Sequence, residues 1–174
     1  MSNVFRYRRG DTKPVFVAPA SATVIEIGDL VYLDWTTHQP KPASDLADQG
    51  TEALNQDLLQ QYFLGVAEQA SASGETSPIR IATEGEFEFD CASATFVVGD
   101  LVGADEASSG TALLNQTVVA VDGESKAVGR VAQSEAVATT KVLVRIESTI
   151  MLGGVQAQEP GSSSTSTSSS SSGA

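Results

Sequence analysis

The strongest constraint on how this chain folds is a strand-and-turn pattern that occurs twice. Residues 24–31, VIEIGDLV, are matched 71 positions later by residues 95–102, TFVVGDLV. Glycine allows a positive φ in a tight turn, and the short aspartate side chain can bond nearby backbone amides. We therefore expect the pairs Gly28-Asp29 and Gly99-Asp100 each to end one strand and start the next.

Two later landmarks follow in the same order. Gly65 and Gly129, in the similar strings GVA and GRVA, lie 64 positions apart, and strands beginning at Ile79 and Val142 lie 63 apart. The sequence predicts an internal repeat over about 23–90 and 94–150. Each half would be strand, turn, strand, crossover and strand, and the two halves would close one barrel, with Gly65 and Gly129 as further turn positions. The alternative is that Gly-Asp-Leu-Val is a common strand-turn sequence that occurs twice.

Most of the body shows the period-two alternation of half-buried strands. Ile79, Ile81, Phe87 and Phe89 share one parity, and residues 141–147 alternate in the same way. Shorter strands are expected around 15–17, 24–27, 31–33, 96–98 and 118–121. Many short strands separated by Gly and Asp favour a mainly β fold, a small β-barrel or sandwich built from two similar halves.

One short helix is expected in the first half, from Thr51 to Tyr62. Leu54, Leu58 and Tyr62 repeat every four residues, and glutamines and Asn55 occupy the other positions. Thr51 is a suitable N-cap. The simplest interpretation of the leucine stripe is packing against the sheet.

Charge and composition divide the chain into three parts. Residues 1–14 form a basic N-terminal arm of net charge +3, residues 15–158 a β-rich domain, and residues 159–174 a Ser-rich flexible tail, while the whole chain has net charge -12. A basic arm on an acidic body steers toward a negatively charged partner surface. The alternative is a frayed, solvated terminus.

Composition also excludes several classes of function. The acidic balance argues against nucleic acid as a partner, because phosphate neutralisation needs Lys and Arg. No stretch approaches the roughly 20 apolar residues of a membrane span, so no membrane partner is expected. The single Cys91 and single His38 leave no basis for a disulfide framework or a multi-histidine metal centre.

No catalytic motif is found in the sequence. The Gly-Lys step of a Walker A motif and the Gly-x-Ser-x-Gly motif are both absent. A row of carboxylates on one strand parity could bind Ca²⁺ or supply an acid-base pair, but the preferred interpretation is a solvated strand face. The row comprises Glu84, Glu86, Glu88 and Asp90. We therefore expect no enzyme, no cofactor and no metal.

Four strings resemble a known family. FLGVA at 63–67, PIRIATEGEFEF at 78–89, VGDLVG at 98–103 and AVGRV at 127–131 are similar to the capsid cement, or decoration, proteins of tailed bacteriophages. That family was formerly described as a domain of unknown function and sometimes labelled a recombinase, a label that the missing Walker A motif contradicts here. The resemblance covers roughly residues 24–150.

The resemblance implies a small β-rich domain, typically a homotrimer, on the outer capsid surface of the virion after synthesis in the host cytoplasm. Its partners would be the major capsid protein and other copies of itself, and it would stabilise the shell by bridging capsid subunits. The family offers no catalytic residues. The predicted capsid contacts lie in the arm and in the first strand, which could add to an exposed sheet edge: Arg6, Arg8, Arg9, Lys13, Val15 and Val17.

Two other functions are considered. One is a virion-surface adhesive or carbohydrate-binding β-module, with Trp35, Tyr32 and Tyr62 as stacking candidates. The other is a hydrolase that uses a carboxylate pair from the acidic row.

Overall fold

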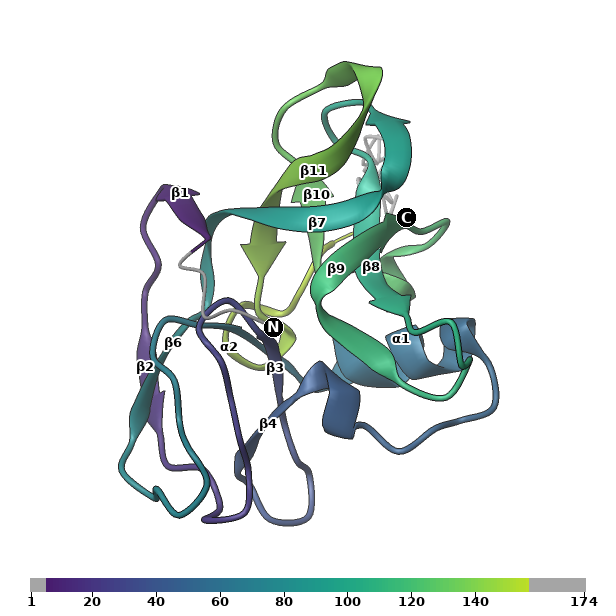
Figure 1. Cartoon of the computed structure of the whole chain (residues 1–174). Coiled ribbons are helices and arrows are strands. Elements are labelled where there is room, and N and C mark those ends of the chain that lie inside the picture. The colour runs from purple at the N-terminus through teal and green to yellow at the C-terminus, as the bar shows by residue number, and fades with distance from the viewer. Residues whose placement is uncertain (1–5, 157–174) are drawn as a thin grey trace, which may run out of the picture.

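The computed structural model describes residues 6–156, which form two β-sheets, one main helix and three single-turn helices (Figure 1). The predicted tail lies outside these residues. The first sheet contains β1 (Tyr7–Arg9), β7 (Glu84–Phe96), β8 (Leu101–Glu106), β9 (Leu113–Ala120), β10 (Gly129–Val131) and β11 (Glu135–Glu147). The second contains β2 (Val15–Val17), β3 (Leu30–Leu33), β4 (Pro40–Pro42), β5 (Phe63–Ala67) and β6 (Ile79–Ala82). The helices are η1 (Ala43–Asp45), α1 (Glu52–Gln61), η2 (Glu124–Lys126) and α2 (Thr149–Leu152).

The first sheet closes on itself as a five-stranded barrel. Its strands run in the order β7-β11-β10-β8-β9, and a parallel bridge between Asp90 and Thr117 joins β9 back to β7. The apolar parity of β7 and β11 points inward, with Phe87, Phe89 and Val144 at most 1% exposed. The mainly β prediction, with a barrel, two similar halves and a helix in the first half, is confirmed.

The second sheet is open and has both faces covered. Its strands run β2-β6-β5-β3-β4, and all five residues of β5 are buried. Phe63 and Val66 pack into the main core, whereas Leu64 and Ala67 belong to a smaller cluster on the opposite face. The expectation that the two halves together close one barrel is therefore wrong. In the second sheet β2 and β4 stay at opposite edges without pairing, whereas in the first sheet the 13-residue strand β7 pairs with both β11 and β9 and so closes the ring.

The two copies of the repeat have the same register. Val31 pairs with Gly65 and Val102 pairs with Gly129, in agreement with the offsets of 71 and 64. Both Gly-Asp turns have the same geometry: Gly28 and Gly99 have φ values of 93° and 97°. The carboxylate of Asp29 accepts a bond from the Glu26 N–H at 2.9 Å, and that of Asp100 from the Val97 N–H at 2.8 Å. Gly65 and Gly129 lie within β5 and β10 rather than in turns.

Helix α1 is the insertion that lengthens the first half. In both halves the Gly-Asp turn is followed by two strands and a 3-10 turn, and only the first half adds an α-helix after them. Thr51 caps α1, because its side chain accepts a bond from the Leu54 N–H at 3.3 Å. The predicted faces are partly wrong, since Leu54 is 53% exposed whereas Asn55 and Gln56 are buried. The Gln56 amide donates to the Ala104 carbonyl of β8 at 2.7 Å, so bonds to the barrel compensate the burial.

The strand expected over 24–27 does not form. Only Ile25 makes a bridge there, with Ser71. Val97 and Val98, expected to continue a strand, lie exposed just beyond the end of β7. Ile25 is buried, but Val24, like Val97 and Val98, is exposed, so the apolar residues of these segments indicated neither continuous pairing nor uniform burial.

Candidate functional site

The basic arm lies along β7 and covers the acidic row. β1 pairs antiparallel with β7, with Tyr7 opposite Phe87 and Arg9 opposite Glu86. Four ion pairs follow the strand: Arg6–Asp90 at 2.7 Å, Arg8–Glu88 at 2.9 Å, Arg9–Glu86, and Lys13–Glu84 at 2.9 Å. The period of two on β7 places the four carboxylates on its outer face, where the arm reaches them. The carboxylates of the acidic row therefore bind the cations of the chain's own arm.

Arg6 is the buried cation among the four predicted arm contacts. Its side chain is 7% exposed, and its guanidinium donates to the Gln116 Oε1 at 3.1 Å, the Glu88 carbonyl at 3.3 Å and Asp90 at 2.7 Å. Gln116 in turn donates to Asp29 Oδ1 at 2.8 Å. This network joins the arm, the barrel closure at β7 and β9, and the first Gly-Asp turn. Arg6 is therefore held inside the chain, unlike the other predicted arm contacts.

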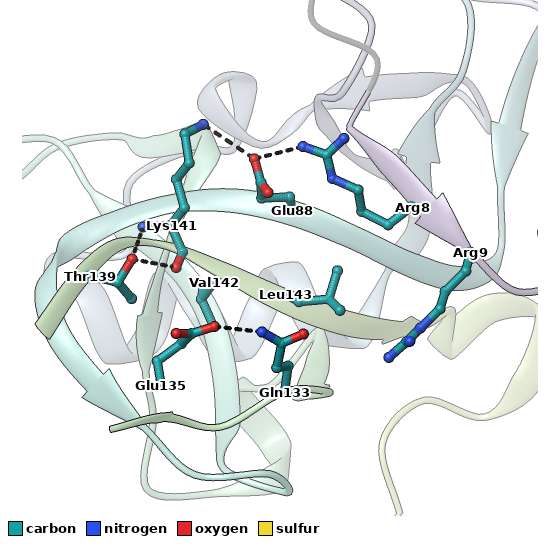
Figure 2. A pocket seen from close by; sticks show the side chains of 9 residues that line it. All are labelled: Arg8, Arg9, Glu88, Gln133, Glu135, Thr139, Lys141, Val142 and Leu143. Atoms are coloured by element: carbon teal, nitrogen blue, oxygen red, sulfur yellow. Dashed lines mark hydrogen bonds and ion pairs between the residues drawn. The ribbon is translucent and has the colours of Figure 1, made fainter. Parts of the chain in front are cut away.

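The remaining arm cations are exposed, and two of them, Arg8 and Arg9, border a groove. Arg8, Arg9 and Lys13 are 51%, 63% and 56% exposed. Figure 2 shows Arg8 and Arg9 on one side of a groove of about 400 Å³, with Lys141 above it. The Lys141 ammonium lies 3.4 Å from Glu88 and 3.3 Å from Asp90, so it shares carboxylates with the arm. The groove can receive polar or acidic groups from a partner.

The surface around the arm differs in charge from the rest of the molecule. We define the arm face as the side chains of residues 6–13 with the outward side chains of 84–90 and 141–147. These ranges contain six basic and six acidic residues, a net charge of zero. The other 4 basic and 16 acidic residues give the entire net charge of -12. An acidic partner would therefore meet less repulsion at the arm face than elsewhere.

The arm pairs make stability dependent on pH. Arg8 lowers the pKa of Glu88, with a smaller effect from Lys141, and Arg6 lowers the pKa of Asp90. Carboxylates with lowered pKa stabilise the folded state above their ordinary values, near pH 4, and this contribution is lost as pH falls through the lowered values. We expect the double variant Glu88→Gln/Asp90→Asn to lose about 1 kcal/mol at neutral pH, a small effect because both groups are partly exposed.

The measurement is urea unfolding of wild type and double variant at neutral pH and at about pH 2. The difference in free energy of unfolding between wild type and double variant should nearly vanish at about pH 2. Burial raises the pKa of Asp29, which acts in the opposite direction, but that contribution is common to both proteins and cancels. If the difference in free energy of unfolding were the same at low pH, the ion pairs of Glu88 and Asp90 would not be its cause.

The other predicted contacts lie on β2, at the edge of the second sheet. Val15 and Val17 are half-buried against the smaller cluster, and Phe16 between them is 64% exposed. β2 pairs with β6 on one side, with Val15 opposite Ile81. As an edge strand, β2 has a position suited to strand addition, with Phe16 as an apolar contact.

Two of the three aromatic stacking candidates are in contact, but the third is buried. Trp35 is 46% exposed and its ring lies 4.9 Å from that of Tyr62. Tyr32 is 2% exposed, and burial, followed by the charges of Asp34 and Asp45, raises its pKa to about 12. The set of three therefore does not form one exposed platform.

The single histidine and the single cysteine lie apart from the arm face. His38 is exposed in a loop, and Cys91 is a buried free thiol whose pKa is raised, chiefly by burial. Between residues 6 and 156, no group of three or more His, Cys, Asp or Glu residues is arranged to hold a metal ion. Within the same range, none of the helices combines the length and hydropathy that a membrane crossing requires.

Comparison with solved structures shows a distant similarity. Neither a protein-family model nor a curated protein matches the chain. Among solved structures, the chain is similar to the head fiber gp8.5 N base in bacteriophage phi29, with a TM-score of 0.42 and 16% sequence identity. The similarity covers 77% of this chain and 94% of the other. At this level it assigns no function to the chain.

Proposed function

We propose that the chain is a structural virion protein, a cement or decoration protein that binds the outer surface of a phage head. The proposal rests on the sequence resemblance of residues 24–150, and the observation that carries it in the structure is the arm face. On a molecule of net charge -12, this is the area where a partner's acidic groups can approach, and it presents the exposed groups of Arg8, Arg9 and Lys13. A face that repels acidic groups less than the rest of the surface favours one docking orientation of an acidic partner.

The action of the protein would be mechanical. The arm face and the neighbouring β2 edge would bind the major capsid protein, and a homotrimer would attach to several shell subunits at once. Several weak contacts in one rigid particle give much tighter attachment than each contact alone. Bridged subunits would then resist separation by internal pressure. No catalytic step, cofactor or metal enters this proposal.

Removing exposed arm cations should weaken attachment without unfolding the protein. For Arg8→Ala/Arg9→Ala we expect affinity for expanded heads to fall at least about tenfold, equivalent to 1.4 kcal/mol. Stability should change little, since exposed ion pairs contribute at most about 1 kcal/mol each. Binding is measured by co-sedimentation of the purified protein with heads that lack it.

The matched control removes the same charge elsewhere. Lys41→Ala/Lys126→Ala also breaks two partly exposed ion pairs, with Asp34 and Asp122, but lies outside both the arm face and the β2 edge. It should bind heads with wild-type affinity. Equal weakening by both variants would show a general effect of net charge and contradict a role for the arm face.

The function itself is tested by quantitative mass spectrometry of purified virions of the phage that encodes the chain. A copy number comparable to that of the major capsid protein supports a cement protein. A few copies per virion would contradict it and favour the adhesive or carbohydrate-binding module, and absence from virions would overturn a virion role.

A further inference from the structure

Beyond the barrel, β7 and β11 continue as a ribbon that has almost no charge. We define the ribbon as residues 91–98 and 132–140; its ends lie at the top of Figure 1. Glu135 is its single charged residue. The ribbon therefore lacks the charged side chains with which exposed strands commonly keep other chains away.

The pairing within the ribbon is interrupted by two bulges. Glu135 pairs with Phe96, Thr139 with Ala94, and Lys141 with Asp90. β11 therefore has two extra residues in the first interval, and β7 has two in the second. A bulge bends its strand and aims side chains out of the sheet. Here it makes residues 136–138, Ala-Val-Ala, protrude.

The protruding segment is apolar and exposed. Val137 is 81% exposed, and the nearby Val97 and Val98 are 64% and 59% exposed. Ala136 and Ala138 on either side are exposed as well. We call residues 136–138 the knob. Exposed apolar side chains that gather on one projection mark an interaction site.

A small apolar hollow lies beside the same ribbon. It has a volume of about 100 Å³ and lies between the end of β7 and the end of β9. Ala92, Ala94, Phe96, Val118 and Ala120 form much of its wall. The knob and the hollow are different surfaces of one chain, each apolar and each without a charged residue of its own.

We infer that the knob of one copy packs into the hollow of a neighbouring copy. Copies with net charge -12 repel one another, and the ribbon lets two of them meet without placing like charges in contact. A contact between two different surfaces is heterologous, so successive contacts form a ring when the rotation closes. This inference rests on the self-association in the proposed function and assigns its surface.

The oligomeric state of the full chain in solution, measured by native mass spectrometry and light scattering, tests the inference. Wild type should form a closed oligomer. Val137→Glu should raise the dissociation constant of assembly at least about 100-fold, because a charge would be buried without a partner. Val24→Glu adds the same charge at a residue that is 51% exposed but lies outside the ribbon, and should assemble as wild type does.

A mixing experiment tests the pairing of knob and hollow directly. Ala92→Glu should block the hollow and leave the knob, whereas Val137→Glu blocks the knob and leaves the hollow. Each variant alone should be monomeric, and an equal mixture should form 1:1 heterodimers and nothing larger. Circular dichroism checks that each variant is folded, and Val137→Ser replaces Val137→Glu if the charged variant does not fold.

Several outcomes would overturn the inference: a monomeric wild type, an oligomeric Val137→Glu, a monomeric Val24→Glu, or a mixture that stays monomeric. None of these measurements includes a phage head. If the protein forms a ring but does not bind heads, the result counts against the proposed function alone. If it binds heads but forms no ring, the result counts against the inference alone.

Discussion

Gly65→Ala and Gly129→Ala are each expected to prevent folding, or to lower the free energy of unfolding by more than about 4 kcal/mol. A Cβ at Gly65 would lie 1.8 Å from the Ala82 carbonyl oxygen, and one at Gly129 would lie 2.4 Å from the Arg145 carbonyl oxygen. Both neighbours are backbone atoms of an adjacent strand, so no side-chain rotation relieves the clash. Gly65 also has a φ of +152°, which L side chains rarely adopt. Circular dichroism and urea unfolding measure the effect.

The control is a glycine with room for a methyl group. At Gly123 the φ is -154° and the nearest atom to an added Cβ is the Lys126 Cε at 4.0 Å. Gly123→Ala should therefore change stability by less than about 0.5 kcal/mol. If Gly65→Ala or Gly129→Ala had the same free energy of unfolding as wild type, the paired strands could move apart at low cost. That result would contradict the tight approach seen in both halves.

These two glycines also show what the repeat pattern could and could not predict. The matched positions of Gly65 and Gly129 are evident from the sequence. The sequence predicts turns at both positions, because glycine is commonest in turns. The structure places them inside strands, where the backbone of a neighbouring strand comes too close for a side chain. A close approach depends on which strand lies beside the glycine, and a single sequence does not contain that information.

Strand parity was the most reliable signal in the sequence. It identified the buried faces of β6, β7 and β11 because a period of two follows directly from strand geometry. The buried amides of α1 were missed for the opposite reason. Asn55 and Gln56 are polar, and only the edge of β8 and neighbouring carboxylates make their burial favourable, through bonds such as Asn55 Nδ2 to Glu106 Oε1 at 2.9 Å. The partners on β8, Glu106 and the Ala104 carbonyl, are about 50 residues away along the chain, although Asp48, Gln49 and Glu52 also bond these amides locally.

The sequence predicts the charged residues of the candidate site but not how they pair. The sequence pointed separately to four arm cations and to four carboxylates of one parity, but not to their pairing. Equal and opposite charge in the two sets was a usable signal, and the outward parity of Lys141 and Arg145 extended it. Gln116 carried no signal, since nothing near it in sequence suggests a buried contact with Arg6. The juxtaposition depends on β1 lying beside β7, a contact over roughly 80 positions.

Arg6→Ala should lower the free energy of unfolding by about 3 kcal/mol, more than any other single arm substitution, because charged hydrogen bonds are lost and buried polar groups are left without partners. Gln116, 3% exposed, would lose its bond from Arg6, and Asp90 its 2.7 Å ion pair. Arg6→Lys should recover only part of the loss, since one ammonium cannot reproduce the planar guanidinium that serves three acceptors. Urea unfolding measures all variants.

Arg8→Ala is the matched control, because it removes the same side chain two residues away from a pair in which Arg8 is 51% exposed. It should cost less than about 1 kcal/mol. If Arg6→Ala and Arg8→Ala cost the same, the buried network would contribute nothing beyond a surface ion pair. A large difference would instead mean that one arm has two separable roles, since Arg6 would fasten it to the barrel closure and leave Arg8, Arg9 and Lys13 on a fixed surface. If Arg6→Ala alone lost head binding, the cause would be an arm that no longer lies on β7. The residues that contact the head must therefore be identified with variants of the exposed cations Arg8, Arg9 and Lys13.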